Sequence, residues 1–226
     1  KDKVAKLRFP TPSPCGKTPI SAHDLSKSYG SLEIFTDVGV IIDKGSRVVI
    51  LGLNGAGKTT LLRILAGELE SDTGSVAHGQ GLKIGYYAQE HESLDFERTI
   101  LENMMSATAN IREPEARNVL GSFLFSGDDV HKLVKVLSGG ERTRLALATL
   151  VVSAANVLLL DEPTNNLDPA SRDEILAALS EYQGAVILVS HDEGAVQALK
   201  PERVILLPDG DEDLWKEEYF DLVTID

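Results

Sequence analysis

The chain has 226 residues and a mass of 24.4 kDa, enough for one large domain or two small ones with a sizeable core. Its 42% hydrophobic and 25% charged residues, with a mean hydropathy of -0.05, are typical of a globular protein and exclude the disordered class. The longest weakly polar stretch, residues 145–160, is interrupted by Thr149, Ser153 and Asn156 and is too short for a spanning helix. We therefore expect no membrane insertion.

The net charge is -13, from 22 Lys and Arg against 35 Asp and Glu, which disfavours a direct grip on nucleic acid by this chain. Residues 209–226 hold eight of the acids against Lys216 alone, and we expect them to form a solvated acidic tail. The single cysteine, Cys15, cannot form an intrachain disulfide, and no apolar signal segment follows the charged start. The expected compartment is the cytoplasm.

Residues 1–19 contain four prolines and predict an extended, linker-like segment. Strand-like apolar runs then alternate with helical patterns. Strands are predicted at 47–51, 82–88, 157–160, 185–189 and 203–207, and helices at 58–69, 114–125, 141–152, 171–182 and 193–199. This alternation predicts an α/β fold with a mostly parallel sheet, and runs such as VLLL and AVILV indicate strands buried on both faces.

Residues 90–136 show helical patches and no convincing strand. We interpret them as a helical subdomain inserted into the α/β domain, which is predicted to span residues 20–208.

The sequence GLNGAGKT at residues 52–59 matches the phosphate-loop pattern G-x-x-x-x-G-K-[ST], between the strand RVVIL and the helix TTLLRILAGEL. Glycines let such a loop fold around an anion with its N–H groups inward, and the helix N-terminus favours phosphate. The lysine can reach the β and γ phosphates, and the threonine hydroxyl can bind Mg²⁺. The predicted nucleotide-binding residues are Gly52, Asn54, Gly55, Gly57, Lys58, Thr59 and Thr60.

Further along, VLLLDEP places Asp161 and Glu162 at the carboxyl end of a buried strand, where ligands of open parallel sheets gather. Asp161 can hold Mg²⁺ through its water shell, and Glu162 can orient and deprotonate an attacking water. Between the two motifs stands LSGGE, residues 137–141. Ser138 and Glu141 fit a simple capping box, but that role does not explain Gly139 and Gly140, which indicate a second phosphate-facing surface.

The phosphate loop, LSGGE and LLLDE in this order resemble the nucleotide-binding domain of ATP-binding cassette proteins, over about residues 20–208. The resemblance implies a P-loop NTPase fold, ATP and Mg²⁺ as ligands, and hydrolysis by paired cassettes. In such a pair, Ser138, Gly139 and Gly140 of one cassette would close over the γ-phosphate held by the other.

The resemblance also assigns roles to single residues. Tyr29 looks like the aromatic residue that stacks on adenine, and His191 resembles the histidine that contacts the γ-phosphate. Gln89 is similar to the glutamine that senses Mg²⁺ and the γ-phosphate. Asp168 falls in the loop 166–168 that communicates between cassettes, although it also fits a helix N-cap ahead of Pro169. The implied catalytic residues are Glu162, His191 and Gln89, and the implied metal-binding residues are Thr59, Gln89 and Asp161.

The segment EPTNNLD, followed by LVSHDEGAV and preceded by the proline-rich start, looks like the second cassette of the F subfamily. These are soluble two-cassette proteins that bind ribosomes and act in translation or antibiotic resistance; the subfamily usually has His where this chain has Asn166. The partner would be the first cassette of the same chain or an identical chain. One alternative is a transporter's nucleotide-binding subunit, in which the region around Gln89 receives a membrane partner. A DNA-repair or chromosome-structure ATPase is the third possibility.

Overall fold

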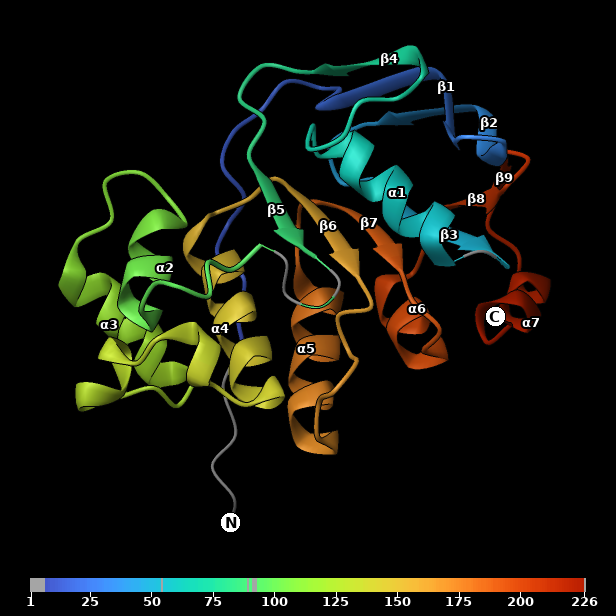
Figure 1. Ribbon diagram of the computed structural model, residues 1–226. Coiled ribbons are helices and arrows are strands. Elements are labelled where there is room, and N and C mark those ends of the chain that lie inside the picture. The colour runs from blue at the N-terminus through green and yellow to red at the C-terminus, as the bar shows by residue number, and fades with distance from the viewer. Residues whose placement is uncertain (1–6, 54, 89, 91–92, 226) are drawn as a thin grey trace.

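The computed structural model describes residues 7–53, 55–88, 90 and 93–225 (Figure 1). The predictions for Asn54 and Gln89 therefore lie outside the described residues. The central element is a six-stranded sheet in the order β5-β6-β7-β3-β8-β9, in which every neighbouring pair is parallel except β8 and β9. Its strands are β3 (Arg47–Gly52), β5 (Ile84–Tyr87), β6 (Val157–Asp161), β7 (Ala185–Val189), β8 (Arg203–Leu207) and β9 (Asp211–Leu214). The predicted mostly parallel sheet is thus observed.

A second, antiparallel sheet lies above the first in Figure 1, and no pattern in the sequence predicted it. It comprises β1 (Ile20–Tyr29), β2 (Leu32–Ile42) and β4 (Thr73–His78) in the order β2-β1-β4. Asp24 and Asp37 adopt left-handed backbone angles (φ 55° and 52°), and the pairing of β1 shifts register three times along β2. Such irregularities interrupt the two-residue alternation by which a one-sided strand is recognised.

The two sheets and their helices form layers. Helix α1 (Gly55–Leu65) lies between the sheets, where Leu61 and Leu65 pack in one apolar cluster with Phe35 of β2 and Ile50 of β3. Figure 1 shows α1 above the parallel sheet and other helices below it. These are α4 (Gly139–Val152), α5 (Pro169–Glu181) and α6 (Glu193–Leu199). Their apolar faces share a second cluster with the opposite face of the sheet.

The segment predicted as a helical subdomain lies beside α4 in Figure 1 and forms helical elements. Within its described residues, strand pairing is limited to one isolated bridge between Thr99 and Leu133. Its apolar side chains join the cluster that contains α4. The helices are α2 (Ile100–Ser106), α3 (Glu113–Ser122), η2 (Gly127–His131) and η3 (Val134–Val136).

The segments 7–19 and 209–225 pack more closely against the rest of the domain than their composition suggests. Residues 7–19 form no helix or strand, yet Phe9 packs edge-on against Tyr182 with ring centroids 5.3 Å apart, and Ser13 N donates to Ala154 O at 3.0 Å. Within residues 209–225 the acidic side chains are mostly exposed, as expected from their charge, but the segment also includes β9, η4 (Glu217–Tyr219) and α7 (Phe220–Val223). Apolar side chains spaced among the acids, such as the buried Val223, attach this segment to the core.

Among the helices in the described part of the chain, none has both the length and the apolarity needed to span a bilayer.

Candidate nucleotide-binding and hydrolysis site

The predicted phosphate loop connects the end of β3 to the start of α1. Lys58 lies in the first turn of α1 and is 3% exposed. Its Nζ donates to Gly52 O at 2.9 Å and lies 3.4 Å from His191 Nε2. A Cβ added at Gly52 would lie 2.7 Å from Leu207 O, so strand packing by itself requires this glycine. The ammonium group of Lys58 thus lies between the phosphate loop and His191, which follows the end of β7.

Thr59 and Asp161 form the second contact of the site. Thr59 Oγ1, in α1, donates to Asp161 Oδ2 at 2.7 Å, and Asp161 ends β6 with 1% exposure. Hydroxyl and carboxylate oxygens are the ligands that Mg²⁺ prefers, usually together with waters and phosphate oxygens. The pair therefore fits the predicted metal role, and the adjoining Thr60, 7% exposed, is in the same helical turn.

Glu162 and His191 form the third contact. Glu162 follows β6 in a left-handed conformation (φ 52°), which is costly for a non-glycine residue and is concentrated at functional sites. Its carboxylate contacts His191 Nδ1 and accepts a hydrogen bond from His191 N at 3.2 Å. An ammonium can only donate, so the contact of Lys58 with Nε2 suits the tautomer in which the Nδ1 proton faces Glu162. Glu162, His191 and Lys58 form one hydrogen-bonded chain.

Tyr29 is the last residue of β1. It is 50% exposed and is paired with Leu32 across the β1–β2 turn. Lys27 Nζ lies 5.4 Å from the centre of its ring. An exposed ring beside a cationic side chain can receive a stacked base, as the predicted role requires.

Ser138, Gly139 and Gly140 stand at the start of α4. The capping box is present, because Glu141 N donates to Ser138 Oγ at 3.2 Å and Ser138 N donates to Glu141 Oε1 at 3.0 Å. This second hydrogen bond lowers the pKa of Glu141. Beyond the neighbouring backbone of α4 itself, a Cβ added at either glycine would have no atom of the described residues within 4 Å. The chain's own packing therefore does not require glycine at these two exposed positions.

The structure brings this motif together with the loop 166–168 and keeps both away from the phosphate loop. Ser138, Gly140, Asn166 and Asp168 line one pocket between the starts of α4 and α5. Figure 1 shows both helices beginning at the lower edge of the molecule, whereas α1 begins beside β3. Asp168 is the N-cap of α5, and its hydrogen bonds from Ser171 lower its pKa. Asn166 is left-handed (φ 63°), a conformation that asparagine adopts more readily than most residues.

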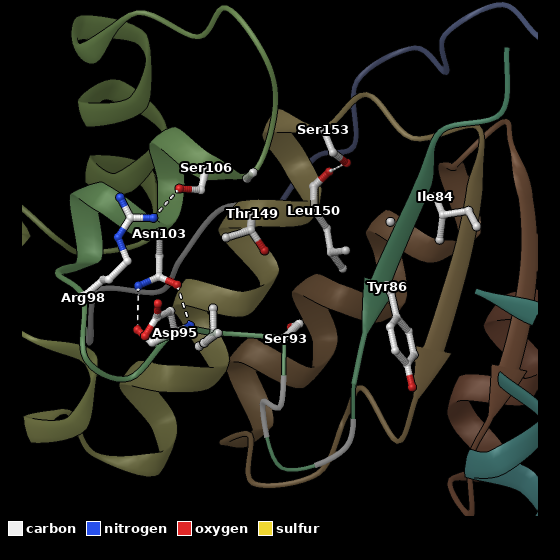
Figure 2. Close-up of a pocket in the computed structure, with 13 residues that line it drawn as sticks. Ile84, Tyr86, Ser93, Asp95, Arg98, Asn103, Ser106, Thr149, Leu150 and Ser153 are labelled. Carbon is white, nitrogen blue, oxygen red and sulfur yellow. Dashed lines mark hydrogen bonds between the residues drawn. The ribbon is translucent and has the colours of Figure 1, made fainter. Parts of the chain in front are cut away.

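A separate pocket lies between the edge strand β5 and the helical subdomain. Figure 2 shows Ile84 and Tyr86 of β5 on one side and Arg98, Asn103 and Ser106 on the other. Asn103 accepts from Asp95 N at 2.9 Å and donates to Asp95 O at 3.0 Å, and Arg98 Nη1 donates to Ser106 Oγ at 2.9 Å (Figure 2). The side of the pocket formed by the helical subdomain is therefore largely polar, and its polar groups are hydrogen-bonded to one another.

Two residues near the site were missed by sequence reasoning. Arg172, in the first turn of α5, binds Asp192, the residue that follows His191 and caps α6. The position of Asp192 next to His191 was the available signal, but its partner could not be identified without the tertiary structure.

The family model described as "ABC transporter" matches residues 35–165, which is more than half of the chain. The chain belongs to the ATP-binding cassette (ABC) family. Family membership makes it an ATP-binding ATPase domain, with the predicted fold class.

Similar curated proteins support the resemblance to the F subfamily. The "ABC transporter F family member 5" of Arabidopsis thaliana is 34% identical over 210 residues, covering 92% of this chain and 30% of that protein. The "Putative ATP-binding protein YdiF" of Bacillus subtilis (strain 168) is 40% identical over 192 residues, covering 84% of this chain and 30% of that protein. The ABC chain thus spans roughly a third of the length of the curated relatives it matches.

Solved ABC structures share the fold. The "Dimeric Structure of MJ0796, a Bacterial ABC Transporter Cassette" has 25% sequence identity and a TM-score of 0.72, covering 87% of this chain and 99% of that one. A second structure of MJ0796, 24% identical with the same TM-score, is described as dimeric, post-hydrolysis and bound to ADP and Pi. This second likeness concerns the fold alone.

Proposed function

We propose that this ABC domain is a Mg²⁺-dependent, ATP-hydrolysing cassette of an F-type cytoplasmic protein that acts on the ribosome, in translation regulation or antibiotic resistance. The observation that carries the enzymatic part is the hydrogen-bonded chain of Glu162, His191 and Lys58 beside the Thr59–Asp161 contact. The F-type part rests on the relative named as an F family member and on the EPTNNLD and LVSHDEGAV segments.

Each side chain has a distinct task in this proposal. Lys58 turns from Gly52 O to the β and γ phosphates, where its charge offsets theirs. Thr59 and Asp161 hold Mg²⁺ directly or through water. The bound ion neutralises charge that develops on the phosphates. Glu162 accepts a proton from the attacking water, and His191 orients the carboxylate through its backbone N–H and its ring.

The proposal requires a second cassette. Gly139 and Gly140 leave open space at the start of α4, and their surface is remote from the phosphate loop of the same chain (Figure 1). A surface of this kind suits the nucleotide held by another cassette. The partner is the first cassette of a longer chain or an identical chain, and the related MJ0796 cassette is described as dimeric.

The ATP site is tested with Lys58→Ala, using Lys44→Ala as the matched control because Lys44 is exposed and precedes β3, at the opposite end of that strand from the loop. We expect Lys58→Ala to lose most Mg²⁺-dependent ATP binding while remaining folded, and Lys44→Ala to bind as the parent does. A folded Lys58→Ala variant with parental ATP affinity would show that the phosphate-loop assignment is wrong.

The cellular role is tested by co-sedimentation of the full-length protein with ribosomes in the presence of ATP and of ADP. Nucleotide-dependent association is the expected result. The alternative is a transporter subunit, which the polar pocket between β5 and α2 favours, because transporter cassettes resembling this chain receive their membrane partner in that region (Figure 2). Co-purification with a membrane permease, and no ribosome in either nucleotide state, would support that alternative.

A further inference from the structure

Arg172 and Asp192 form a two-point ion pair between the first turns of α5 and α6. Arg172 Nε donates to Asp192 Oδ2 and Nη2 donates to Oδ1, both at 2.7 Å. The guanidinium also lies 4.0 Å from the carboxylate of Asp173, which is largely exposed. Parallel hydrogen bonds of the bidentate kind fix orientation as well as distance. The pair therefore holds the start of α6 in a defined position relative to the start of α5.

Asp192 is connected to the proposed catalytic carboxylate of Glu162 through the adjacent residue His191. Asp192 caps α6 by accepting from Gly194 N at 2.9 Å, and it shares a hydrogen bond with the Thr164 side chain. The preceding residue is His191, whose backbone and ring both bind Glu162. A shift of Asp192 would therefore move the groups that orient Glu162.

Arg172 is connected to the pocket beside the start of α4 through Asp168. Arg172 N donates to Asp168 O at 2.9 Å, and Asp168 caps the same helix through Ser171 N. Asp168 and Asn166 line the pocket that also contains Ser138. One arginine thus connects the residues around Glu162 with the loop 166–168.

Gly194, two residues after Asp192, leaves space for the guanidinium of Arg172. A Cβ added at Gly194 would lie 2.3 Å from Arg172 Nη2 and 3.1 Å from Asp192 Oδ1. Because both hydrogen bonds hold the guanidinium in place, it could not move away without breaking the pair. Glycine at position 194 is a condition for the bidentate geometry.

We propose that Arg172 is a positioning residue for ATP hydrolysis. It acts through Asp192 to hold His191 at a fixed position relative to the loop 166–168. The inference rests on the proposed function, in which this loop faces a second cassette. Contact of that cassette with the loop is then transmitted to the carboxylate that activates water. Arg172 itself touches neither nucleotide nor water in this scheme.

The test compares kcat, KM for ATP and thermal stability in the full-length protein for Arg172→Met, Arg172→Lys, Asp192→Asn and the double variant Arg172→Met/Asp192→Asn. Arg203→Met is the matched control, because it removes a similar arginine–carboxylate contact, 2.9 Å from Glu212, at the distant β8–β9 pair. We expect Arg172→Met to lower kcat by about 10- to 100-fold with KM within about twofold of the parent, since a small misplacement of reacting groups costs that much. Arg172→Lys should recover part of kcat.

If the two residues act through one another, Asp192→Asn loses a similar factor and the double variant loses no more than either single variant. Parental kcat in Arg172→Met, additive losses in the double variant, or an equal loss in Arg203→Met would each overturn the proposal. Should Arg172→Met not fold, Gly194→Ala displaces the guanidinium while keeping both charges, and a parental kcat in that variant would overturn it. A parent protein without ATPase activity would instead refute the proposed function.

Discussion

Thr59 Oγ1 donates a hydrogen bond to Asp161 Oδ2 at 2.7 Å, joining the first turn of α1 to the carboxyl end of β6. The two residues are 102 positions apart in sequence and come together because β6 and β3 are both central strands of one parallel sheet. Oxygen ligands from two rigid elements suit a hard cation whose geometry is strict.

Asp161→Asn is predicted to weaken the apparent Mg²⁺ affinity of the ATP complex by about 10- to 100-fold, because the amide removes a charge from the metal's immediate surroundings. The measurement is ATP binding during a Mg²⁺ titration. Asp43→Asn is the control, since Asp43 accepts a hydrogen bond of the same length, 2.7 Å, from Thr18 outside the site. Equal Mg²⁺ dependence in both variants would contradict the metal assignment.

Glu162→Gln is predicted to keep ATP affinity and to lose turnover by about 10²- to 10⁴-fold, or roughly 3 to 5 kcal/mol of barrier. The amide oxygen can still accept from His191 Nδ1, so positioning survives while proton acceptance does not. Single-turnover hydrolysis under saturating ATP and partner cassette measures the effect, with the exposed Glu181→Gln as control. Hydrolysis by Glu162→Gln at the parental rate would make Glu162 a structural carboxylate.

Tyr29→Ala is predicted to weaken ATP and ADP binding by the same factor, about 2- to 10-fold, because both nucleotides carry the base and a stacked pair contributes about 0.5–1.5 kcal/mol. Tyr29→Phe keeps the ring and should bind as the parent does. Calorimetric titration with each nucleotide is the measurement. A loss for ATP with none for ADP would place Tyr29 near the γ-phosphate.

Asn156→Ala is predicted to lower the free energy of unfolding by about 2–4 kcal/mol, because it removes three hydrogen bonds to part-buried backbone groups. The side chain, 3% exposed, accepts from Lys83 N and donates to Ser13 O and Gly81 O, at 2.8, 3.0 and 2.9 Å. Urea unfolding measures the loss, and Asn118→Ala, exposed in α3, is the control. A loss no greater than that of the control would mean that water replaces these hydrogen bonds.

The Arg172–Asp192 pair predicts an acid-sensitive contribution to stability. Hydrogen bonds from Arg172 lower the pKa of Asp192 from 3.8 to about 2. Since the folded-state pKa is depressed, the stabilisation is present above the unfolded value and is lost as pH falls from about 4 to about 2. The difference in thermal stability between the parent and Asp192→Asn should therefore be constant near neutral pH and shrink over this window. A difference that persists undiminished at pH 2 would assign it to something other than this ionisation.

Local patterns predicted the parallel sheet, the helices that cover it and the residues proposed to bind phosphate. Buried strands such as β6 and β7 read as unbroken apolar runs, and α6 was predicted with its observed bounds. The phosphate loop and the capping boxes are recognisable because their function depends on residues within eight positions of one another. For the same reason Asp168 was correctly predicted as the cap of α5.

Only the tertiary structure decided which distant side chains meet. The contact of Glu162 with His191, and of Arg172 with Asp192, depends on strand order and on the packing of α5 against α6, which no local pattern encodes. The antiparallel sheet was hidden because bulges at Asp24 and Asp37 break its alternation. In the acidic segment, charge predicted the exposure of the acids, whereas the contacts of the few apolar side chains between them, and the pairing of β9 with β8, came only from the tertiary structure.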